Sequence, residues 1–475
     1  MHNGFIVEIK ELKPHTNADK LQLATFFGET VIVGLDTKIG DIGIYFPCDL
    51  QLSEEYCDAN DLCRKKADGT DGNGYLERDK RNIKAISLRG EKSYGLYAPL
   101  ESLKFTGIDL TTLKVGDTIE VVNGISICCK YVPRRSNRSG AAGAGAGNRT
   151  RKKKVNIAPF FAEHADTEQL AYNLSAFRPG DEIEITLKMH GTSQRTGYLP
   201  VLQGYRRTFL DWLFRREGTP IYEYGYVSGT RRTVLENYEG GYYGDNSFRE
   251  QHSKIFEGKL WKGETVYYEV VGFTSSGSPI MGQAANKKMN DKDFIKQYGE
   301  TTTFSYGCSS QALPAIIKAP EMIEVAPTVP QSDMYVYRMT MTNEDGNVVE
   351  YTPDFMRYRC EQMGVKTVPV FFRGTINERY KNGDGSINYS LSNGIIAASC
   401  DGEEKIGEMI KNAAEFFYDG PDPIGKTHIR EGVVVRIINR PKFCAYKHKN
   451  FAFKVLEGLI KDTASAPDME EAQDV

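Results

Sequence analysis

The sequence predicts an α+β fold, with a small β-barrel at the N-terminus followed by a larger unit of strands and a few helices. Up to about residue 129, short runs of β-branched and aromatic residues alternate with turns that contain Gly, Asp or Pro. This spacing is typical of a small closed barrel. From residue 157 to 461, strand-like and helix-like stretches follow one another without regular alternation, which disfavours a doubly wound parallel sheet. We therefore expect domains at 1–129 and 157–461.

Six short strands are predicted in the first domain, at Phe5–Ile9, Leu21–Phe27, Val31–Leu35, Ile44–Pro47, Lys84–Leu88 and Gly95–Ala98. Two motifs add to this pattern, PHTNADKL at Pro14–Leu21 and ISLRG at Ile86–Gly90. Both resemble segments of the tRNA-binding type of OB-fold. The resemblance implies an OB-like barrel that binds nucleic acid, although the fold alone does not establish that function.

Residues 130–156 form a predicted linker that is rich in Arg and Lys, with Gly and Ala at its centre, and Lys130–Lys154 contains no acid. Small residues bury too little surface to order such a stretch. It is either a solvated tether or an arm that neutralises phosphates. Residues 462–475 are acidic, and we expect a disordered tail. The net charge of −3 over 475 residues excludes a wholly basic, histone-like protein.

In the larger domain, helices are predicted at Asp354–Met363 and Glu403–Phe417. Strands are predicted at Glu182–Lys188, Thr265–Gly272, Met334–Met341, Thr367–Phe372 and Gly432–Ile438. No apolar run approaches the roughly 18 residues of a membrane span, and no signal region opens the chain, so we expect a cytoplasmic protein without a membrane partner. The nine cysteines are scattered without a CxxC pair, which favours reduced thiols. His428 and His448 lack a third ligand at a spacing suitable for zinc.

The strongest functional signal is Lys188, in the motif KMHGTS directly after a predicted strand. Four further motifs follow in order, with Glu269 in YYEVVG, Tyr337 in YVYRM, Glu431 in EGVVVR, and Lys447 with Lys449 in AYKHKN. Together they resemble motifs I, III, IIIa, IV and V of the covalent nucleotidyltransferases, which comprise DNA ligases, RNA ligases and mRNA capping enzymes. The resemblance implies a nucleotidyltransferase domain of antiparallel sheets at 157–461.

Two of these motifs indicate RNA ligases within that superfamily. KMHGTS and AYKHKN are most similar to the nick-sealing RNA ligases of the phage T4 second-ligase type, and a barrel ahead of the catalytic domain is similar to the Deinococcus-type RNA ligases. His190 occupies a variable position of motif I, where DNA ligases usually have Asp. DNA ligases and capping guanylyltransferases usually carry a C-terminal OB domain, for which too few residues follow Lys454.

The resemblance implies that Lys188 attacks the α-phosphorus of ATP and becomes adenylylated. An ordinary lysine has a pKa near about 10.4, and nearby cations lower it. We expect Lys447, Lys449 and a bound Mg²⁺ or Mn²⁺ to supply that positive field and to offset charge on the phosphates. Glu431 would hold the hydrated metal ion, since Mg²⁺ prefers carboxylate oxygen and water.

The remaining roles concern the nucleoside and the RNA end. By resemblance, Glu269 would bind the ribose and Tyr337 would stack on adenine, with Tyr335 as the alternative. Arg231 or Arg232 would bind phosphate or the RNA end, and the sequence does not distinguish the two.

The predicted function is an ATP-dependent RNA ligase of RNA repair. It would join 3′-OH and 5′-phosphate ends of RNA, with a nicked duplex as the expected substrate, through a lysyl-AMP and then an AMP-capped RNA intermediate. We expect it to act as a monomer. The alternatives are a DNA ligase or capping guanylyltransferase, or a non-catalytic RNA-binding protein that uses only the barrel and the basic arm.

Overall fold

The computed structural model describes residues 3–48, 50–72, 74–131, 157–165, 167–209, 218–235, 238–239, 243–289, 291–312, 317–319, 322–325, 329–393 and 397–462. The chain divides into two compact units. The first comprises Met1–Arg134, Ala171–Asn173 and Phe451–Thr463, and the second holds the rest. The expected linker at 130–156 and tail at 462–475 lie almost wholly outside the described residues.

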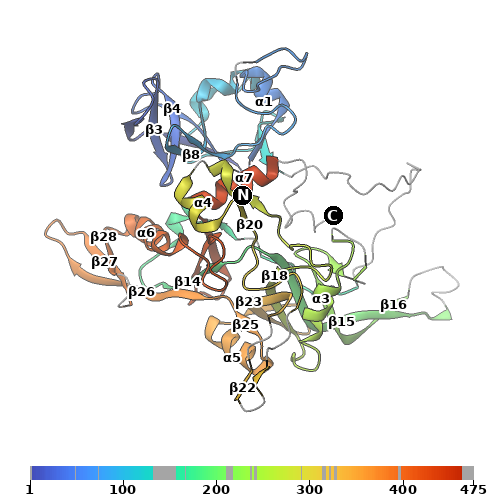
Figure 1. Ribbon diagram of the computed structural model, residues 1–475. Coiled ribbons are helices and arrows are strands. Elements are labelled where there is room, and N and C mark those ends of the chain that lie inside the picture. Colours follow the sequence, from blue (N-terminus) through green and yellow to red (C-terminus); the bar gives the residue numbers. More distant parts are fainter. Residues whose placement is uncertain are drawn as a thin grey trace. The chain divides into compact units, whose positions relative to one another are not determined.

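Antiparallel sheets form the first unit (Figure 1). A five-stranded sheet has the order β7 (Ala85–Leu88), β8 (Glu91–Pro99), β5 (Ile42–Pro47), β1 (Gly4–Glu8) and β9 (Thr118–Ile119). A three-stranded sheet consists of β2 (Leu12–Pro14), β3 (Leu21–Phe26) and β4 (Glu29–Gly34). The six strands expected from the sequence are all present, with ends shifted by a few residues. The OB-like barrel itself stays a prediction.

The two motifs singled out in the first unit are bonded to each other. The ring Nε2 of His15 lies 3.2 Å from the carbonyl oxygen of Leu88, and the Asn17 amide donates to the carbonyl of Arg89 at 3.1 Å. Segments about 70 residues apart in sequence are thus held together. Hydrogen bonds from side chains to the backbone hold loops in place where no backbone hydrogen bonds of a sheet do so.

Helix α7 (Phe451–Asp462) belongs to the first unit, although the sequence assigned residues up to 461 to the catalytic domain. Its Phe451 ring meets the Tyr94 ring edge-on, with 4.8 Å between centroids. The Lys454 ammonium lies 2.9 Å from the carboxylate of Glu29. An aromatic pair and a nearly buried ion pair therefore attach this helix to the N-terminal strands.

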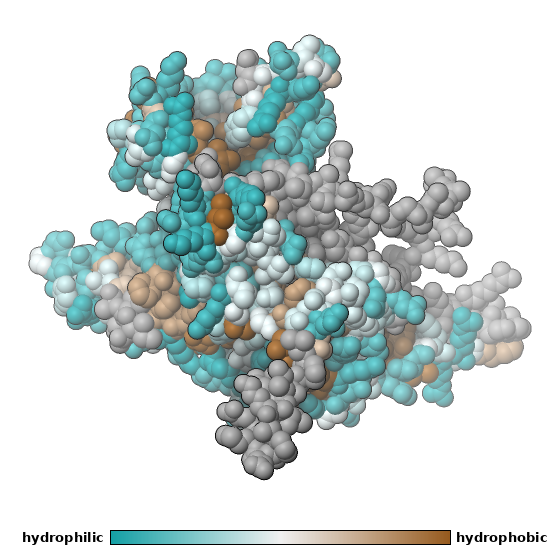
Figure 2. Space-filling view, viewed as in Figure 1, coloured by the Kyte–Doolittle hydropathy of each residue, from teal (hydrophilic) through white to brown (hydrophobic). Residues whose placement is uncertain are grey.

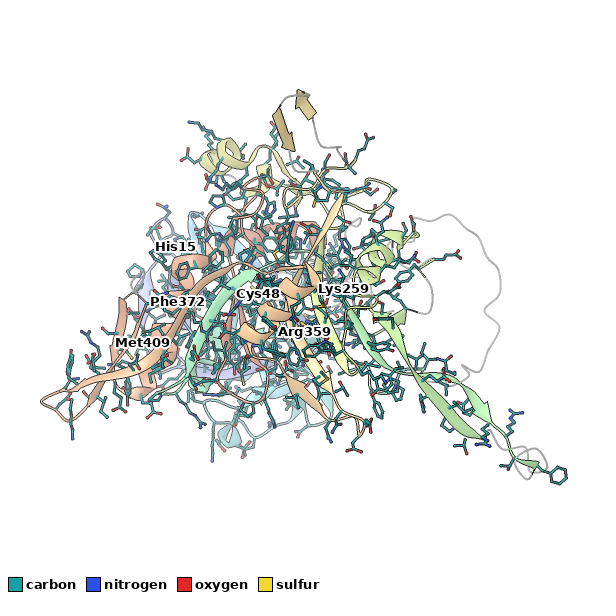
Figure 3. All side chains as sticks on the ribbon, turned by 90° about the horizontal axis from the view of Figure 1, so that it is seen from below. His15, Cys48, Lys259, Arg359, Phe372 and Met409 are labelled. Atoms are coloured by element: carbon teal, nitrogen blue, oxygen red, sulfur yellow. The ribbon has the colours of Figure 1, made fainter. Side chains whose placement is uncertain are left out.

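Two seven-stranded sheets are the largest sheets of the second unit among the described residues. One has the order β13 (Glu168–Gln169), β30 (Cys444–Lys449), β29 (Gly432–Ile437), β14 (Glu182–Lys188), β26 (Val370–Lys381), β27 (Ile387–Ser392) and β28 (Ala397–Asp401). The other has the order β17 (Val234–Leu235), β16 (Thr219–Gly229), β15 (Thr192–Arg206), β18 (Glu264–Gly272), β23 (Ser332–Thr342) and β24 (Val348–Glu350), with β25 (Lys366–Thr367) also on β23. All described pairs are antiparallel except β13–β30 and β23–β25. Figures 1 and 3 show β15 and β16 as a long ribbon that projects from this unit.

One face of the first of these sheets is covered by helix α6 (Ile406–Tyr418). The helix buries Ile406, Ile410 and Phe417 against Ile185 and Val435 of the sheet. The expected amphipathic helix is thus confirmed in its position, and its apolar stripe explains why it packs there. This leaves the opposite face of the sheet available for polar side chains.

Helix α5 (Pro353–Met363) matches the sequence prediction, with Thr352 as its N-cap and a left-handed Gly364 as its C-cap. The sequence predicted a single strand at Thr367–Phe372, and this prediction is wrong because the segment belongs to two strands. β25 ends at Thr367, and β26 begins at Val370. Pro369 lies between them, and it has no backbone N–H to donate to a strand ladder.

Residues 273–331, for which the sequence offered no interpretation, form an insert between β18 and β23. It contains the short hairpin β19 (Ala284–Ala285) and β20 (Thr301–Thr302) and helix α4 (Lys292–Tyr298). Figure 2 shows mostly hydrophilic side chains on the visible surface around α4. Phe304 and Tyr306, just beyond the hairpin, are by contrast buried.

Across the described ranges, no helix has the length and apolar content that crossing a membrane requires.

Candidate active site

Three adjacent strands of the α6-covered sheet build one wall of a cleft in the second unit. Because side chains alternate between the two faces of a strand, each strand sends every second residue into the cleft while its neighbours enter the core under α6. The residues that face the cleft in this way are Glu184, Thr186 and Lys188 of β14, Val434 and Arg436 of β29, and Ala445, Lys447 and Lys449 of β30. All three lysines that the sequence selected therefore line one wall.

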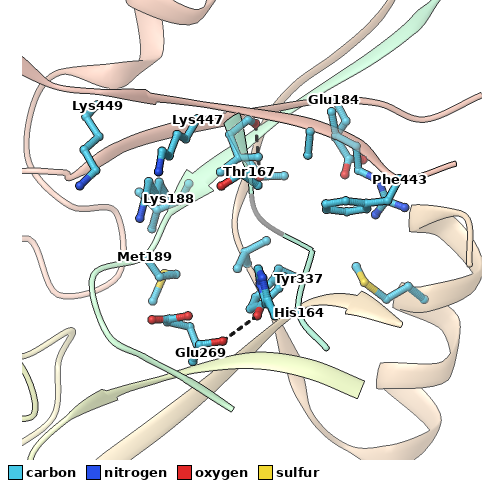
Figure 4. A pocket seen from close by; sticks show the side chains of 18 of the residues that line it. His164, Thr167, Glu184, Lys188, Met189, Glu269, Tyr337, Phe443, Lys447 and Lys449 are labelled. Carbon is cyan, nitrogen blue, oxygen red and sulfur yellow. Dashed lines mark hydrogen bonds between the residues drawn. The ribbon is translucent and has the colours of Figure 1, made fainter. Parts of the chain in front are cut away.

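The opposite wall comes from β15, β18 and β23 (Figure 4). It carries Ser193, Glu269 and Tyr337, and Ser193 is paired in register with Glu269. The hydroxyl groups of Ser193 and Tyr337 lie 3.0 Å apart, within hydrogen-bond distance. Between the two walls the cleft opens to solvent at its mouth.

At the end of β14, the Lys188 ammonium contacts a buried carboxylate. Its Nζ lies 2.8 Å from Oε1 of Glu431, and Nζ of Lys449 lies 3.3 Å from the same oxygen. Glu431 is only 2% exposed, and the lysine side chains are 12% and 9% exposed. In Figure 4, Lys188, Lys447 and Lys449 point into the same region of the cleft.

The electrostatics of Glu431 follow from these contacts. Burial acts to raise the pKa of this carboxyl, but the positive charges of Lys188 and Lys449 overcome burial and hold the pKa well below its ordinary value. Glu431 is thus ionised at neutral pH. Two ammonium groups of the cleft wall therefore share one buried carboxylate, and Glu431 itself is not among the described residues that line the cleft.

Gly432 makes this arrangement sterically feasible. In register it lies opposite Lys188 on one side and Lys449 on the other. Its φ of +149° is unfavourable for any residue with a Cβ, and a Cβ placed there would lie 2.1 Å from the carbonyl oxygen of His448. Only glycine allows β29 and β30 to approach this closely beside Glu431.

The structure separates two pairs of candidates that the sequence left open. Tyr337 and Arg231 line the cleft, whereas Tyr335 and Arg232 are not among its described lining residues. The hydroxyl of Tyr335 donates instead to Asp333 at 3.2 Å. Burial raises the pKa of Tyr337, so its hydroxyl stays protonated.

His190 lies near the same carboxylate, with its Nδ1 3.6 Å from Oε2 of Glu431. Its backbone N–H donates to the hydroxyl of Tyr306 at 2.7 Å, and the His190 ring meets Phe304 edge-on with 4.6 Å between centroids. Phe304 and Tyr306 were missed by sequence reasoning, because no periodicity or motif distinguishes them within the insert.

A divalent ion would find one suitable ligand here. Oε2 of Glu431 is buried and has no hydrogen-bond partner among the described residues, with Nδ1 of His190 3.6 Å away. No group of three or more His, Cys, Asp or Glu side chains that could hold a metal occurs in the described ranges. A single carboxylate fits Mg²⁺ or Mn²⁺ that keeps most of its water and also contacts phosphate, and it does not fit a fully protein-bound ion.

No protein-family model matches the chain, and no curated protein matches its sequence. Solved structures of Naegleria gruberi RNA ligase are similar to it at 16% sequence identity. A mutant with ATP and Mn has a TM-score of 0.54 and covers 96% of this chain and 98% of that chain. For a mutant with AMP and Mn the values are 0.53, 96% and 98%, and for the ligase with PPi they are 0.52, 95% and 98%. The chain thus has the fold of these RNA ligases over nearly its whole length.

Proposed function

We propose that the protein is an ATP-dependent RNA ligase that joins a 3′-OH end to a 5′-phosphate end, using Mg²⁺ or Mn²⁺. The observation that carries the proposal is the position of Lys188, whose amine lies in the wall of a cleft beside Lys449 and the buried Glu431. The likeness to RNA ligases solved with ATP, AMP or PPi supports the same reading. A surface lysine would show neither the burial nor the converging charges.

In the first step, Lys188 Nζ loses a proton to water, leaves Glu431 and attacks the α-phosphorus of ATP. The N–P bond forms as the bond to pyrophosphate breaks, which yields lysyl-AMP. Lys447 and Lys449 offset the charge that develops on the phosphate oxygens. A divalent ion held by Glu431 would supply Lewis-acid stabilisation of the phosphates.

In the second step, an oxygen of the RNA 5′-phosphate attacks the phosphorus of lysyl-AMP. The N–P bond breaks, Lys188 regains a proton, and an AMP-capped RNA results. In the third step, the 3′-OH attacks the 5′-phosphate of that RNA, and AMP leaves. The same two lysines, Lys447 and Lys449, face phosphate in each step, so one site serves the whole sequence.

The other lining residues would position the substrates. Tyr337 would stack on adenine, and Glu269, on the neighbouring strand β18, would bind the ribose. Arg231 would bind phosphate or the RNA end, since it lines the cleft and Arg232 does not. The N-terminal domain at 1–129 would bind RNA, with a nicked duplex as the substrate.

The proposal is tested by incubating the protein with ATP labelled at the α-phosphate and Mn²⁺. We expect a covalent protein-AMP adduct that Lys188→Ala abolishes. Lys262→Ala is the matched control, because this lysine lies over the Tyr224 ring and does not line the cleft. An unlabelled wild-type protein, or labelling by GTP in place of ATP, would contradict the proposal.

A sealing assay separates RNA ligase from DNA ligase. Nicked duplexes with a 3′-OH and a 5′-phosphate are prepared with RNA or DNA on each side of the nick. We expect sealing whenever the 3′-OH strand is RNA. Equal sealing of an all-DNA nick would assign the protein to the DNA ligases instead.

A further inference from the structure

A pair of buried aromatic residues in the insert packs between two histidines of the site. Phe304 and Tyr306 are each only 2% exposed. One of the histidines, His190, comes two residues after Lys188, and the other, His428, comes three residues before Glu431. The pair therefore lies between the segment that carries the nucleophile and the segment that carries the acidic group.

Each aromatic residue contacts both segments. The Phe304 ring lies 4.6 Å from the ring of His190 and 5.3 Å from that of His428, measured between centroids. The Tyr306 hydroxyl accepts the backbone N–H of His190 at 2.7 Å, and its ring lies 4.5 Å from the His428 ring. Edge-on ring contacts of this kind favour one geometry over others.

The insert also fits closely on the loop before Glu431. A Cβ at Gly425 would lie 2.6 Å from the backbone nitrogen of Gly307, so glycine is needed for the two backbones to meet. Ser305 and Thr427 face each other with 3.2 Å between their hydroxyl oxygens. This close packing of the two backbones holds the insert in a fixed position on the loop.

Tyr306 itself adopts a strained conformation. Its φ of +48° is uncommon for a residue other than glycine, and rare for a bulky one. Burial raises the pKa of its hydroxyl well above the ordinary value, so the group stays neutral and can accept the His190 N–H. A strained backbone conformation persists only where contacts with the surrounding structure hold it in place. Such conformations often occur at functional sites.

We propose that Phe304 and Tyr306 form a clamp that sets the position of Lys188 relative to Glu431, and that they are positioning residues for adenylylation of the lysine. The inference rests on the proposed function. Neither residue is among the described residues that line the cleft, so the clamp acts on the rate of the reaction and not on ATP binding. It acts through His190, which lies 3.6 Å from Glu431.

The test compares Tyr306→Phe with the wild-type protein in single-turnover formation of the AMP adduct. The substitution keeps the ring and removes the acceptor of the partly buried His190 N–H, so we expect a roughly tenfold lower rate at saturating ATP. KM for ATP should stay within about twofold of wild type. The Mn²⁺ concentration that gives half-maximal rate should rise severalfold, because Glu431 is no longer held in place beside Lys188.

Tyr298→Phe is the matched control. It makes the same chemical change in α4 of the same insert, where the hydroxyl accepts an exposed hydrogen bond from Gln297 at 3.1 Å. We expect it to match the wild type in rate and in Mn²⁺ dependence. Melting temperatures of both variants establish that each is folded at the assay temperature.

Phe304→Leu gives a second test through a double-mutant cycle with His190→Ala. If the ring contact positions the site, the loss from Phe304→Leu should be clearly smaller in the His190→Ala background than in the wild type. Additive losses would overturn the clamp.

The outcomes separate this inference from the proposed function. A wild-type protein that forms no adduct overturns both. A wild-type adduct that Tyr306→Phe forms at the same rate, or with an unchanged Mn²⁺ dependence, overturns the clamp alone. A slower rate that is explained wholly by a higher KM for ATP also overturns it, because the residue would then act on nucleotide binding.

Discussion

Replacement of Glu431 by Gln tests the charge arrangement of the site directly. Gln has nearly the same shape and keeps an oxygen that accepts hydrogen bonds, but it carries no charge. Glu431 is 2% exposed and lies between the ammonium groups of Lys188 and Lys449. The substitution therefore leaves two nearly buried cations near each other without the anion that compensates them.

The size of the effect follows from the distances. At an effective dielectric constant of about 20, unit charges 2.8 Å apart attract by about 6 kcal/mol and those 3.3 Å apart by about 5 kcal/mol. Desolvation of the charges offsets much of this attraction, and removal of one partner of a buried pair typically costs about 3–5 kcal/mol. Since both ammonium groups retain some contact with solvent, we expect the lower end, about 3 kcal/mol. This corresponds to a fall in Tm on the order of 5 °C.

Calorimetry of both proteins between pH 3 and pH 8 measures this effect and its pH dependence. The pKa of Glu431 is lowered in the folded state, so its stabilising contribution is fully present above the unfolded pKa of about 4.3. The contribution is lost as the pH falls toward the folded pKa. The difference in Tm between the wild-type protein and Glu431→Gln should therefore be constant near neutral pH and become smaller below about pH 4.5.

Glu250→Gln provides the control, because this half-exposed glutamate pairs with the exposed Lys254 on α3 (Ser247–Lys254). Surface pairs contribute at most about 1 kcal/mol, so its Tm should change little. If Glu431→Gln melts at the wild-type temperature at pH 7, or if the difference does not shrink in acid, then Glu431 is not an ionised group held between two cations and the reasoning is refuted.

The remaining predictions concern ATP binding, the two arginines at 231 and 232, and the role of the first compact unit. Tyr337→Ala should weaken ATP binding by roughly 5- to 150-fold, because stacking on a base contributes about 1–3 kcal/mol, while Tyr335→Phe should leave ATP affinity, measured by titration, unchanged. Arg231→Ala should slow sealing or adenylylation at least about tenfold and Arg232→Ala should have a smaller effect, as measured in single-turnover assays. Removal of residues 1–134 together with everything after Asn450 takes away the first unit except Ala171–Asn173, and it should spare adenylylation and weaken sealing. Equal sealing by that protein would contradict a role of the first unit in holding RNA.

Much of the site could be predicted because strands impose a simple geometry. The predicted strand Glu182–Lys188 coincides with β14, and alternation along it places Lys188 on the face opposite the core. The same rule brings Lys447 and Lys449 together on β30. An ordered set of motifs on strands therefore contains most of the information about which side chains meet.

Other features depend on contacts between distant segments, which local patterns do not encode. The pairing of Glu431 with Lys188 needs β29 and β14 to be neighbours, although about 240 residues separate them. Phe304 and Tyr306 lie in an insert without regular periodicity, so their burial against His190 depends on tertiary packing alone. The placement of α7 in the first unit likewise depends on contacts such as Lys454 with Glu29, since the amphipathic pattern of a helix does not identify the surface that covers it.

The two-lysine arrangement has a consequence for how the proposed reaction begins. In the resting geometry the amine of Lys188 is engaged with Glu431, so this contact has to open before the nitrogen attacks. Opening a buried ion pair ordinarily leaves an uncompensated charge, at a cost of several kcal/mol. Here Lys449 stays 3.3 Å from the same carboxylate oxygen. One lysine can therefore become neutral and move toward phosphorus while the other keeps the carboxylate compensated, which lowers the barrier to the first step.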